Sequence, residues 1–119
     1  MNYYLVDFEN VRTDGIKDLK GVKEGDSMIF FYSENCKSTT LDFLDSLMEL
    51  KIKYKSYKVK VGTRNALDFQ LSSYLGYLIG KYGTNTNYYI VSDDKGFEVV
   101  AAFWKDQKIP VSCVSLKEK

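Results

Sequence analysis

Apolar and aromatic residues recur along the chain in five short runs, separated by more polar stretches. Short runs rich in apolar, β-branched and aromatic residues are typical of strands buried in a parallel sheet. The predicted strands are Tyr3–Val6, Met28–Tyr32, Tyr54–Val61, Tyr88–Val91 and Val111–Val114.

Between these runs, apolar residues follow helical spacing instead. The spacing predicts a helix after Lys37, one from Asn65 to about Tyr82, one over Lys95–Gln107, and a short one around Ile16–Leu19. Ser38 and Thr39 are candidate N-caps of the first helix, and Gly83 is a candidate stop for the second.

Strands that alternate with helices in this way predict a parallel sheet with helices on both faces. We therefore expect residues 1–119 to form a single domain of the α/β class, a three-layer α/β/α sandwich with a central, mostly parallel five-stranded sheet. In such sheets, ligands bind beyond the carboxyl ends of the strands, near the point where the strand order reverses. Functional residues are expected at that edge.

The composition narrows the chemistry that could occur there. The 119 residues include no histidine, which excludes Ser-His-Asp and Cys-His nucleophiles and His-containing zinc sites. The 17 Lys and Arg residues nearly balance the 16 Asp and Glu residues, and the net charge of +1 excludes a basic tail protein but not a local basic patch. An enzyme of this composition would depend on carboxylates and, most simply, on divalent metal ions.

The sequence also bears on the cellular setting. No segment approaches the roughly 20 apolar residues of a membrane span, so we expect no membrane partner. The N-terminus lacks the charged start and cleavage site of a secretion signal. Because Cys36 and Cys113 suggest no disulfide scaffold, we expect a cytoplasmic protein.

Acidic residues stand at the ends of several predicted elements. Asp7 ends the first strand, Asp68 lies in the first turn of the long helix, and Asp94 follows the fourth strand, with Glu98 one helical turn further. In a parallel sheet these carboxylates meet at one rim, where their repulsion favours a bound cation. Asp68 and Asp94 could instead cap helices, whereas Asp7 follows a buried strand, where an unpartnered carboxylate is costly. Glu9 is a weaker candidate, because acids in loops are commonly only solvated.

Three segments resemble the motifs of PIN-like nucleases, especially those of the NYN-type branch. Val6–Val11 is similar to the opening motif, in which a strand ends in Asp and Asn follows three residues later. Asn65–Leu71 is similar to the central motif, an Asp at the start of a long helix. Val91–Glu98 is similar to the final motif, Ser-x-Asp followed by a second acid, although Gly96 stands where many relatives have another Asp.

The resemblance implies a metal-dependent endoribonuclease that hydrolyses RNA phosphodiester bonds with Mg²⁺ or Mn²⁺. It implies Asp7, Asp68 and Asp94 as metal ligands and catalytic residues. Glu98 would be a fourth catalytic acid, and Asn10 would orient Asp7 or a metal-bound water.

A basic tract precedes the long helix. From Lys51 to Arg64 the sequence has six basic residues, no acids and two interleaved tyrosines. Lysines bind phosphates and tyrosines stack on unpaired bases, so we expect Lys58, Lys60 and Arg64, joined by Ser92 of the final motif, to contact a single-stranded RNA substrate. The alternative is an edge strand whose lysines block pairing with another chain.

Three further interpretations stay open. Gly96 favours a non-catalytic RNA- or protein-binding module on a degenerate PIN-like scaffold. The Asp7-Phe8-Glu9 segment resembles the start of haloacid dehalogenase-type phosphatases, but no later Lys motif accompanies it. Gly76 and Gly80, four residues apart on the long helix, permit close packing within the domain or, alternatively, in a homodimer.

Overall fold

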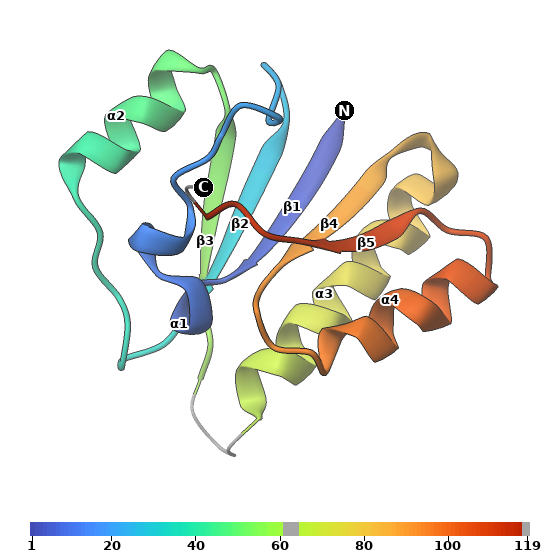
Figure 1. The fold of residues 1–119 in the computed structure, drawn as a ribbon. Helices are drawn as coiled ribbons and strands as arrows, with labels where there is room; N and C mark the ends of the chain where they lie inside the picture. Colours follow the sequence, from blue (N-terminus) through green and yellow to red (C-terminus); the bar gives the residue numbers. More distant parts are fainter. Residues whose placement is uncertain (61–64, 118–119) are drawn as a thin grey trace.

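The computed structural model describes residues 1–60 and 65–117, and its centre is a sheet of five strands (Figure 1). The strands are β1 (Asn2–Asp7), β2 (Ser27–Tyr32), β3 (Lys53–Lys58), β4 (Asn87–Val91) and β5 (Val111–Val114). Their order across the sheet is β3-β2-β1-β4-β5, and every neighbouring pair is parallel. The predicted three-layer α/β/α fold is confirmed, with a sheet that is parallel throughout.

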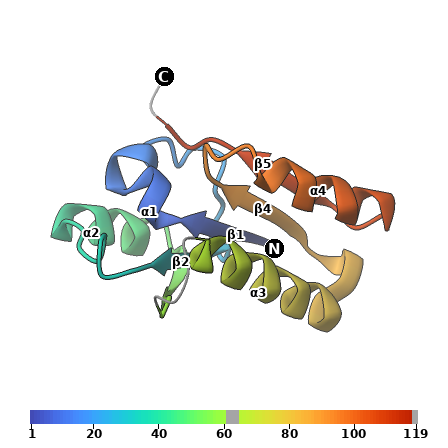
Figure 2. The same ribbon diagram turned by 90° about the horizontal axis from the view of Figure 1, so that it is seen from below.

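Helices cover both faces of this sheet (Figure 2). They are α1 (Phe8–Val11), α2 (Leu41–Glu49), α3 (Ala66–Tyr82) and α4 (Phe97–Asp106). Adjacent residues of β1 serve the two faces: Val6 lies in the hydrophobic cluster with α1 and α2, and Leu5 lies in the cluster with α3 and α4. Both side chains are fully buried, which explains why the strand is apolar at successive positions. Over the residues that the structure describes, no helix is long and apolar enough to cross a membrane.

The segment after α1 differs from its prediction. The short helix predicted around Ile16–Leu19 was wrong, because the backbone there pairs with the chain near its C-terminal end. Ile16 forms a parallel bridge with Leu116, and the N–H groups of Lys17 and Asp18 donate to the Leu116 carbonyl at 2.9 and 2.8 Å. A short helix occurs earlier, in α1, directly after β1.

Two boundaries also differ from the prediction. Thr40 is the N-cap of α2, through its side-chain oxygen, so the prediction of Ser38 or Thr39 was wrong. β3 ends at Lys58, and the predicted end at Val61 lies outside the described residues. β3 is the edge strand, and all six of its residues are exposed.

The long helix α3 closely matches its prediction. Its apolar stripe is fully buried at Leu71 and Leu75, and it ends at Gly83, where a positive φ of 59° suits a residue without a side chain. A Cβ atom at Gly76 would lie 3.8 Å from the ring of Trp104 in α4. That distance is an ordinary van der Waals contact, so Gly76 faces α4 within the domain but the packing does not require a glycine there, and the homodimer stays a prediction.

The strand order reverses at the middle of the sheet. From β1 the chain moves outward to β2 and β3, and it then returns to add β4 on the other side of β1. Val6 of β1 pairs with Val91 of β4 just before both strands end. Asp7, the last residue of β1, and Ser92, which directly follows β4, therefore flank the crevice where ligands bind in sheets of this type.

Candidate active site at the carboxyl ends of the strands

Asp7 is the buried centre of this crevice. It ends β1 and is the N-cap of α1, and one of its carboxylate oxygens accepts from the Asn10 N–H at 3.3 Å. The other oxygen accepts from the Ser92 hydroxyl at 3.0 Å. The residue is only 5% exposed. Two strand ends and one helix start thus fix the orientation of a single carboxylate.

The surroundings of Asp7 disfavour its negative charge. The pKa of its carboxyl is raised from the usual 3.8 to about 6, chiefly by burial and also by the nearby charges of Asp68 and Glu9. The hydrogen bonds from Ser92 and Asn10 act in the opposite direction and lower this pKa. A carboxylate in this state gains more from a nearby cation than a solvated one does.

The turn after β4 is built around Asn10 and Ser92. The Asn10 side-chain oxygen accepts from the Asp93 N–H at 2.8 Å, and the Ser92 hydroxyl oxygen accepts from the Asp94 N–H at 3.1 Å. Asp94 in turn accepts from the Gly96 N–H at 2.8 Å. A Cβ at position 96 would lie 3.1 Å from that Asp94 oxygen, so glycine relieves a tight contact in this turn. Gly96 thus has a local structural role here.

Asp68 lies in the first turn of α3 and is half-buried. Burial raises the pKa of its carboxyl, and the charges of Asp94 and Glu9 raise it as well. The N-cap of α3, Asn65, makes no side-chain capping bond, so the two residues do not form the capping arrangement that the sequence left open. Asp68 is the electrostatic link between the acids that follow β1 and β4.

Glu9 belongs to this group, although the sequence alone marks it only as a weaker candidate. Its carboxylate accepts from the hydroxyl of Ser33, a residue that directly follows β2 and is 2% exposed, at 3.0 Å. The charge of Glu9 contributes to the raised pKa values of both Asp7 and Asp68. The available signal was its position two residues after Asp7. Asp7, Glu9, Asp68 and Asp94 are hereafter the acidic rim.

The surroundings of the other predicted site residues differ from those of the acidic rim. Glu98 is exposed in the first turn of α4, where its charge contributes to the raised pKa of the Cys113 thiol in β5. Lys58 forms an ion pair with Glu34. Lys60 is exposed just after β3, and Arg64 lies outside the described residues.

Glu34 joins two lysines beside the end of β2. In addition to Lys58, it pairs with Lys37 at 2.7 Å. Hydrogen bonds from Lys37 and Lys58 lower the pKa of the Glu34 carboxyl to about 2. In this conformation, the charge of Lys58 is therefore already neutralised by a neighbour.

The side chains of the acidic rim are of the type that binds a divalent cation, but they lie too far apart to hold one together. Its donors are carboxylate oxygens, the ligands that Mg²⁺ and Mn²⁺ prefer, and their mutual repulsion would be relieved by a positive ion. Within residues 1–60 and 65–117, however, no three His, Cys, Asp or Glu side chains lie close enough to hold a metal ion together. Glu9 and Asp94 are exposed, so their side chains have room to change rotamer.

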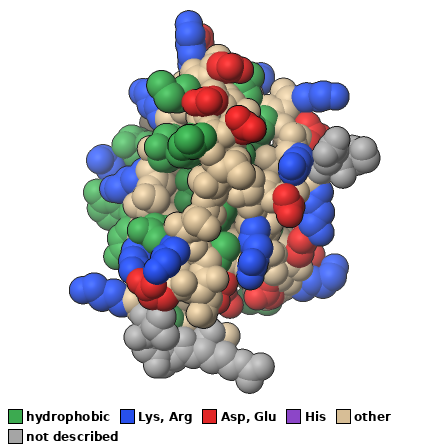
Figure 3. Space-filling view, turned by 90° about the vertical axis from the view of Figure 1, so that its left-hand side faces the viewer, with side chains coloured by type: hydrophobic (Ala, Val, Ile, Leu, Met, Phe, Trp, Pro, Cys, Tyr) green, Lys and Arg blue, Asp and Glu red, His purple; other side chains and the backbone are tan. Residues whose placement is uncertain are grey.

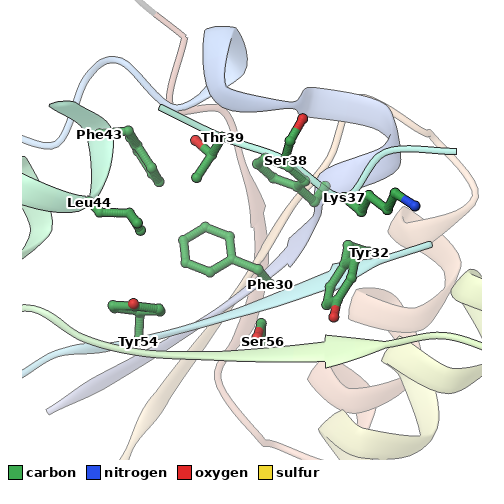
Figure 4. A pocket seen from close by; sticks show the side chains of 10 residues that line it. Phe30, Tyr32, Lys37, Ser38, Thr39, Phe43, Leu44, Tyr54 and Ser56 are labelled. Carbon is green, nitrogen blue, oxygen red and sulfur yellow. The ribbon is translucent and has the colours of Figure 1, made fainter. Parts of the chain in front are cut away.

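A pocket of about 220 Å³ lies on the α2 side of the sheet, and none of the acidic-rim residues lines it. Phe8, the neighbour of Asp7, lines part of it. Figure 4 shows the ring of Phe30 at its centre, between Thr39 on one side and Tyr54 and Ser56 of β3 on the other.

Together, the parallel five-stranded sheet and the helices on its two faces define an α/β/α domain with acidic residues at its switch point. The model of the PIN domain family matches residues 1–114, and the chain belongs to this family. PIN domains are generally nucleases and typically use divalent metals. Neither a curated protein nor a solved structure matches the chain.

Proposed function

We propose that this PIN domain is an endoribonuclease that depends on Mg²⁺ or Mn²⁺ and hydrolyses phosphodiester bonds of single-stranded RNA at the acidic rim. The observation that carries the proposal is the buried Asp7 carboxylate, held by Ser92 and by the Asn10 N–H beside Asp68. A structural role alone does not account for several mutually repelling acids around a desolvated carboxylate. The proposal extends to the NYN-type branch and to a cytoplasmic location.

The residues divide into a cation-holding group and a positioning group. Asp7, Asp68 and Asp94 would hold the cation, with Glu98 as a further acid. When bound, a divalent cation polarises a phosphoryl oxygen and lowers the pKa of water. Asn10 would keep Asp7 oriented by joining the start of α1 to the turn after β4.

Ser92 and the basic residues would act around this group. The Ser92 hydroxyl donates a hydrogen bond to the Asp7 carboxylate and accepts one from the Asp94 N–H, so it would position two acids at once, in addition to its predicted contact with substrate. Lys60 and Arg64 would neutralise substrate phosphates. Lys58 would do so after exchanging its partner Glu34 for a phosphate.

A cleavage assay on single-stranded RNA tests this proposal. We expect cleavage by the parent in Mg²⁺ or Mn²⁺ and none in EDTA, with a loss of roughly 100-fold or more in Asp7→Asn and Asp94→Asn. Ser92→Ala should lose about 10- to 100-fold, because it removes a residue that orients the proposed ligands. Asp14→Asn is the matched control, because the Asp14 side chain is 95% exposed. Equal cleavage by the parent, Asp7→Asn and Asp94→Asn in the presence of metal would refute the mechanism.

A second function, a non-catalytic binding module, is favoured by one observation. In the part of the chain that the structure describes, the acids do not converge within ligating distance of one another. Such a module would bind RNA or protein without turnover and regardless of chelators. Calorimetric titration with Mn²⁺ separates the two functions: heat of binding in the parent that disappears in Asp7→Asn supports the nuclease, and the absence of heat in both supports the module.

A further inference from the structure

A groove of about 280 Å³ lies between the edge strand β3 and helix α3, on the opposite face of the sheet from α2. Lysines and tyrosines dominate its lining. We call it the lysine–tyrosine groove, and its defining residues are Lys53, Lys55, Tyr74, Tyr77, Lys81 and Tyr82.

The groove carries positive charge and no negative charge. No acidic residue lines it. Among the described residues, Lys53, Lys55 and Lys81 form no ion pair, whereas Lys37 and Lys58, beside the acidic rim, are both paired with Glu34. In a chain of net charge +1, such a local excess of cations indicates an anionic ligand. The 220 Å³ pocket near α2 lacks this property, because its only lysine is Lys37.

Two of the three lysines in the groove lie beside aromatic rings. The Lys55 ammonium is 5.8 Å from the centre of the Tyr74 ring, and that of Lys81 is 5.4 Å from the Tyr82 ring and 6.0 Å from the Tyr77 ring. Tyr77 is 60% exposed. A nucleotide of a single strand presents the complementary pair, a phosphate and an unstacked base.

The rings continue from the groove toward the carboxyl end of β3. The Tyr77 ring centre lies 5.8 Å from that of Tyr74, which lies 6.2 Å from that of Tyr57 in β3. Tyr57 is itself 41% exposed. Figure 3, which looks onto the side with β3 and α2, shows hydrophobic and basic side chains along its left-hand side, whereas acidic side chains lie at its top, on its right-hand side and along its lower edge.

α3 connects the groove to the acidic rim. Asp68 lies in its first turn, and at about 1.5 Å per residue Tyr74 and Lys81 lie about 9 and 20 Å further along the helix. A strand with a phosphate at the acidic rim would therefore need only a few more nucleotides to reach the groove.

We propose that the lysine–tyrosine groove binds the single-stranded RNA beyond the bond that is cleaved, with its lysines on phosphates and Tyr77 stacked on a base. The identity of the ligand as RNA rests on the proposed function. Affinity should therefore depend on the length of the RNA, because a strand too short to extend from the acidic rim to the groove makes no contact with the groove.

Fluorescence anisotropy in EDTA measures binding without cleavage. We expect a labelled single-stranded RNA of about 12 nucleotides to bind the parent, and the triple variant K53A/K55A/K81A to bind roughly 10- to 100-fold more weakly at 0.1 M salt. The slope of log affinity against log salt should become shallower by about 2. Tyr77→Ala should weaken binding roughly five- to 100-fold, and Tyr77→Phe should retain it. The matched control is K20A/K23A/K105A, which removes three exposed lysines from other surfaces.

Several outcomes would refute the proposal that the lysine–tyrosine groove binds RNA. The first is equal affinity of the parent and K53A/K55A/K81A for the RNA. The second is a loss of affinity in the control triple variant as large as that in K53A/K55A/K81A. The third is an affinity of the parent for polyphosphate or polyglutamate, which carry no bases, equal to its affinity for the RNA. Equal affinity for double-stranded RNA would also contradict a stacked base. Cleavage in Mn²⁺ is measured separately. If RNA binding depends on the groove but no cleavage occurs, only the proposed nuclease activity is refuted. If cleavage occurs but K53A/K55A/K81A binds RNA as the parent does, only the proposed role of the groove is refuted.

Discussion

Replacing Asp7 with Asn should stabilise the metal-free protein at neutral pH. Burial and the charges of Asp68 and Glu9 raise the pKa of Asp7 from 3.8 to about 6, so the folded state binds this proton more tightly than the unfolded state does. At about 1.4 kcal/mol for each tenfold change in affinity, the ionised carboxylate reduces the free energy of unfolding by about 3 kcal/mol at pH 7. Asn has the same shape and carries no charge.

The pH dependence of this effect has a definite sign. The contribution of Asp7 to stability is fully present below its unfolded pKa of 3.8 and is lost as the pH rises through the folded pKa of about 6. The parent and Asp7→Asn should therefore be similarly stable at pH 4. Their free energies of unfolding should diverge between pH 4 and 7 in favour of the variant.

Urea denaturation in EDTA, at intervals from pH 4 to pH 8, measures the difference. The expected gap of about 3 kcal/mol at pH 7 corresponds to roughly 10 °C in the melting temperature of a chain of this size. Asp14→Asn serves as the control, because it removes a carboxylate that is 95% exposed, and its curve should follow that of the parent. Parallel curves for the parent and Asp7→Asn across the whole range would refute the reasoning, as would a parent that gains stability relative to this variant as the pH rises.

Three further predictions concern metal binding and the core. Mn²⁺ at 100 times its dissociation constant should raise the unfolding free energy of the parent by about 2.7 kcal/mol, and thermal shift should detect no such gain in Asp7→Asn. Asp26→Ala should lose about 2–4 kcal/mol in urea denaturation, because the buried Asp26 carboxylate accepts three N–H bonds from Asn2 and Lys23; a loss below 1 kcal/mol would contradict this. Leu71→Ala should lose about 2–5 kcal/mol in the same assay, whereas Leu41→Ala, at a residue 78% exposed, should change stability by less than about 0.5 kcal/mol.

The features predicted well were those that depend on local patterns. The apolar runs marked all five strands, and the leucine spacing marked α3 through to its stop at Gly83. The four-residue helix α1 escaped prediction because it is too short to show helical spacing, although its cap, Asp7, was noticed for its chemistry. The segment after Ile16 was misjudged because its backbone partner, Leu116, lies far away in the sequence.

The same distinction applies to the candidate site. A carboxylate at the end of a buried strand can be recognised from the sequence, and Asp7 was. Whether a charged side chain is free to bind a ligand depends on its ion pairs and hydrogen bonds with residues far away in the sequence. Glu34 pairs with Lys58, and Ser33 holds Glu9, across a separation of 24 residues in each case, and no local pattern encodes either contact.

The bonds that join the ends of β1 and β4 have a consequence for folding. Ser92 and Asp7 are 85 residues apart in the chain, and Asp93 and Asn10 are 83 apart. Closing such long loops is slow, because contacts of high sequence separation form only after much chain entropy has been lost. A growing polypeptide therefore cannot complete the acidic rim until residue 94 has emerged from the ribosome and β4 has paired with β1. The acidic rim would stay incomplete in every earlier intermediate, so under the proposed function RNA close to the site of synthesis would meet no finished cleavage centre.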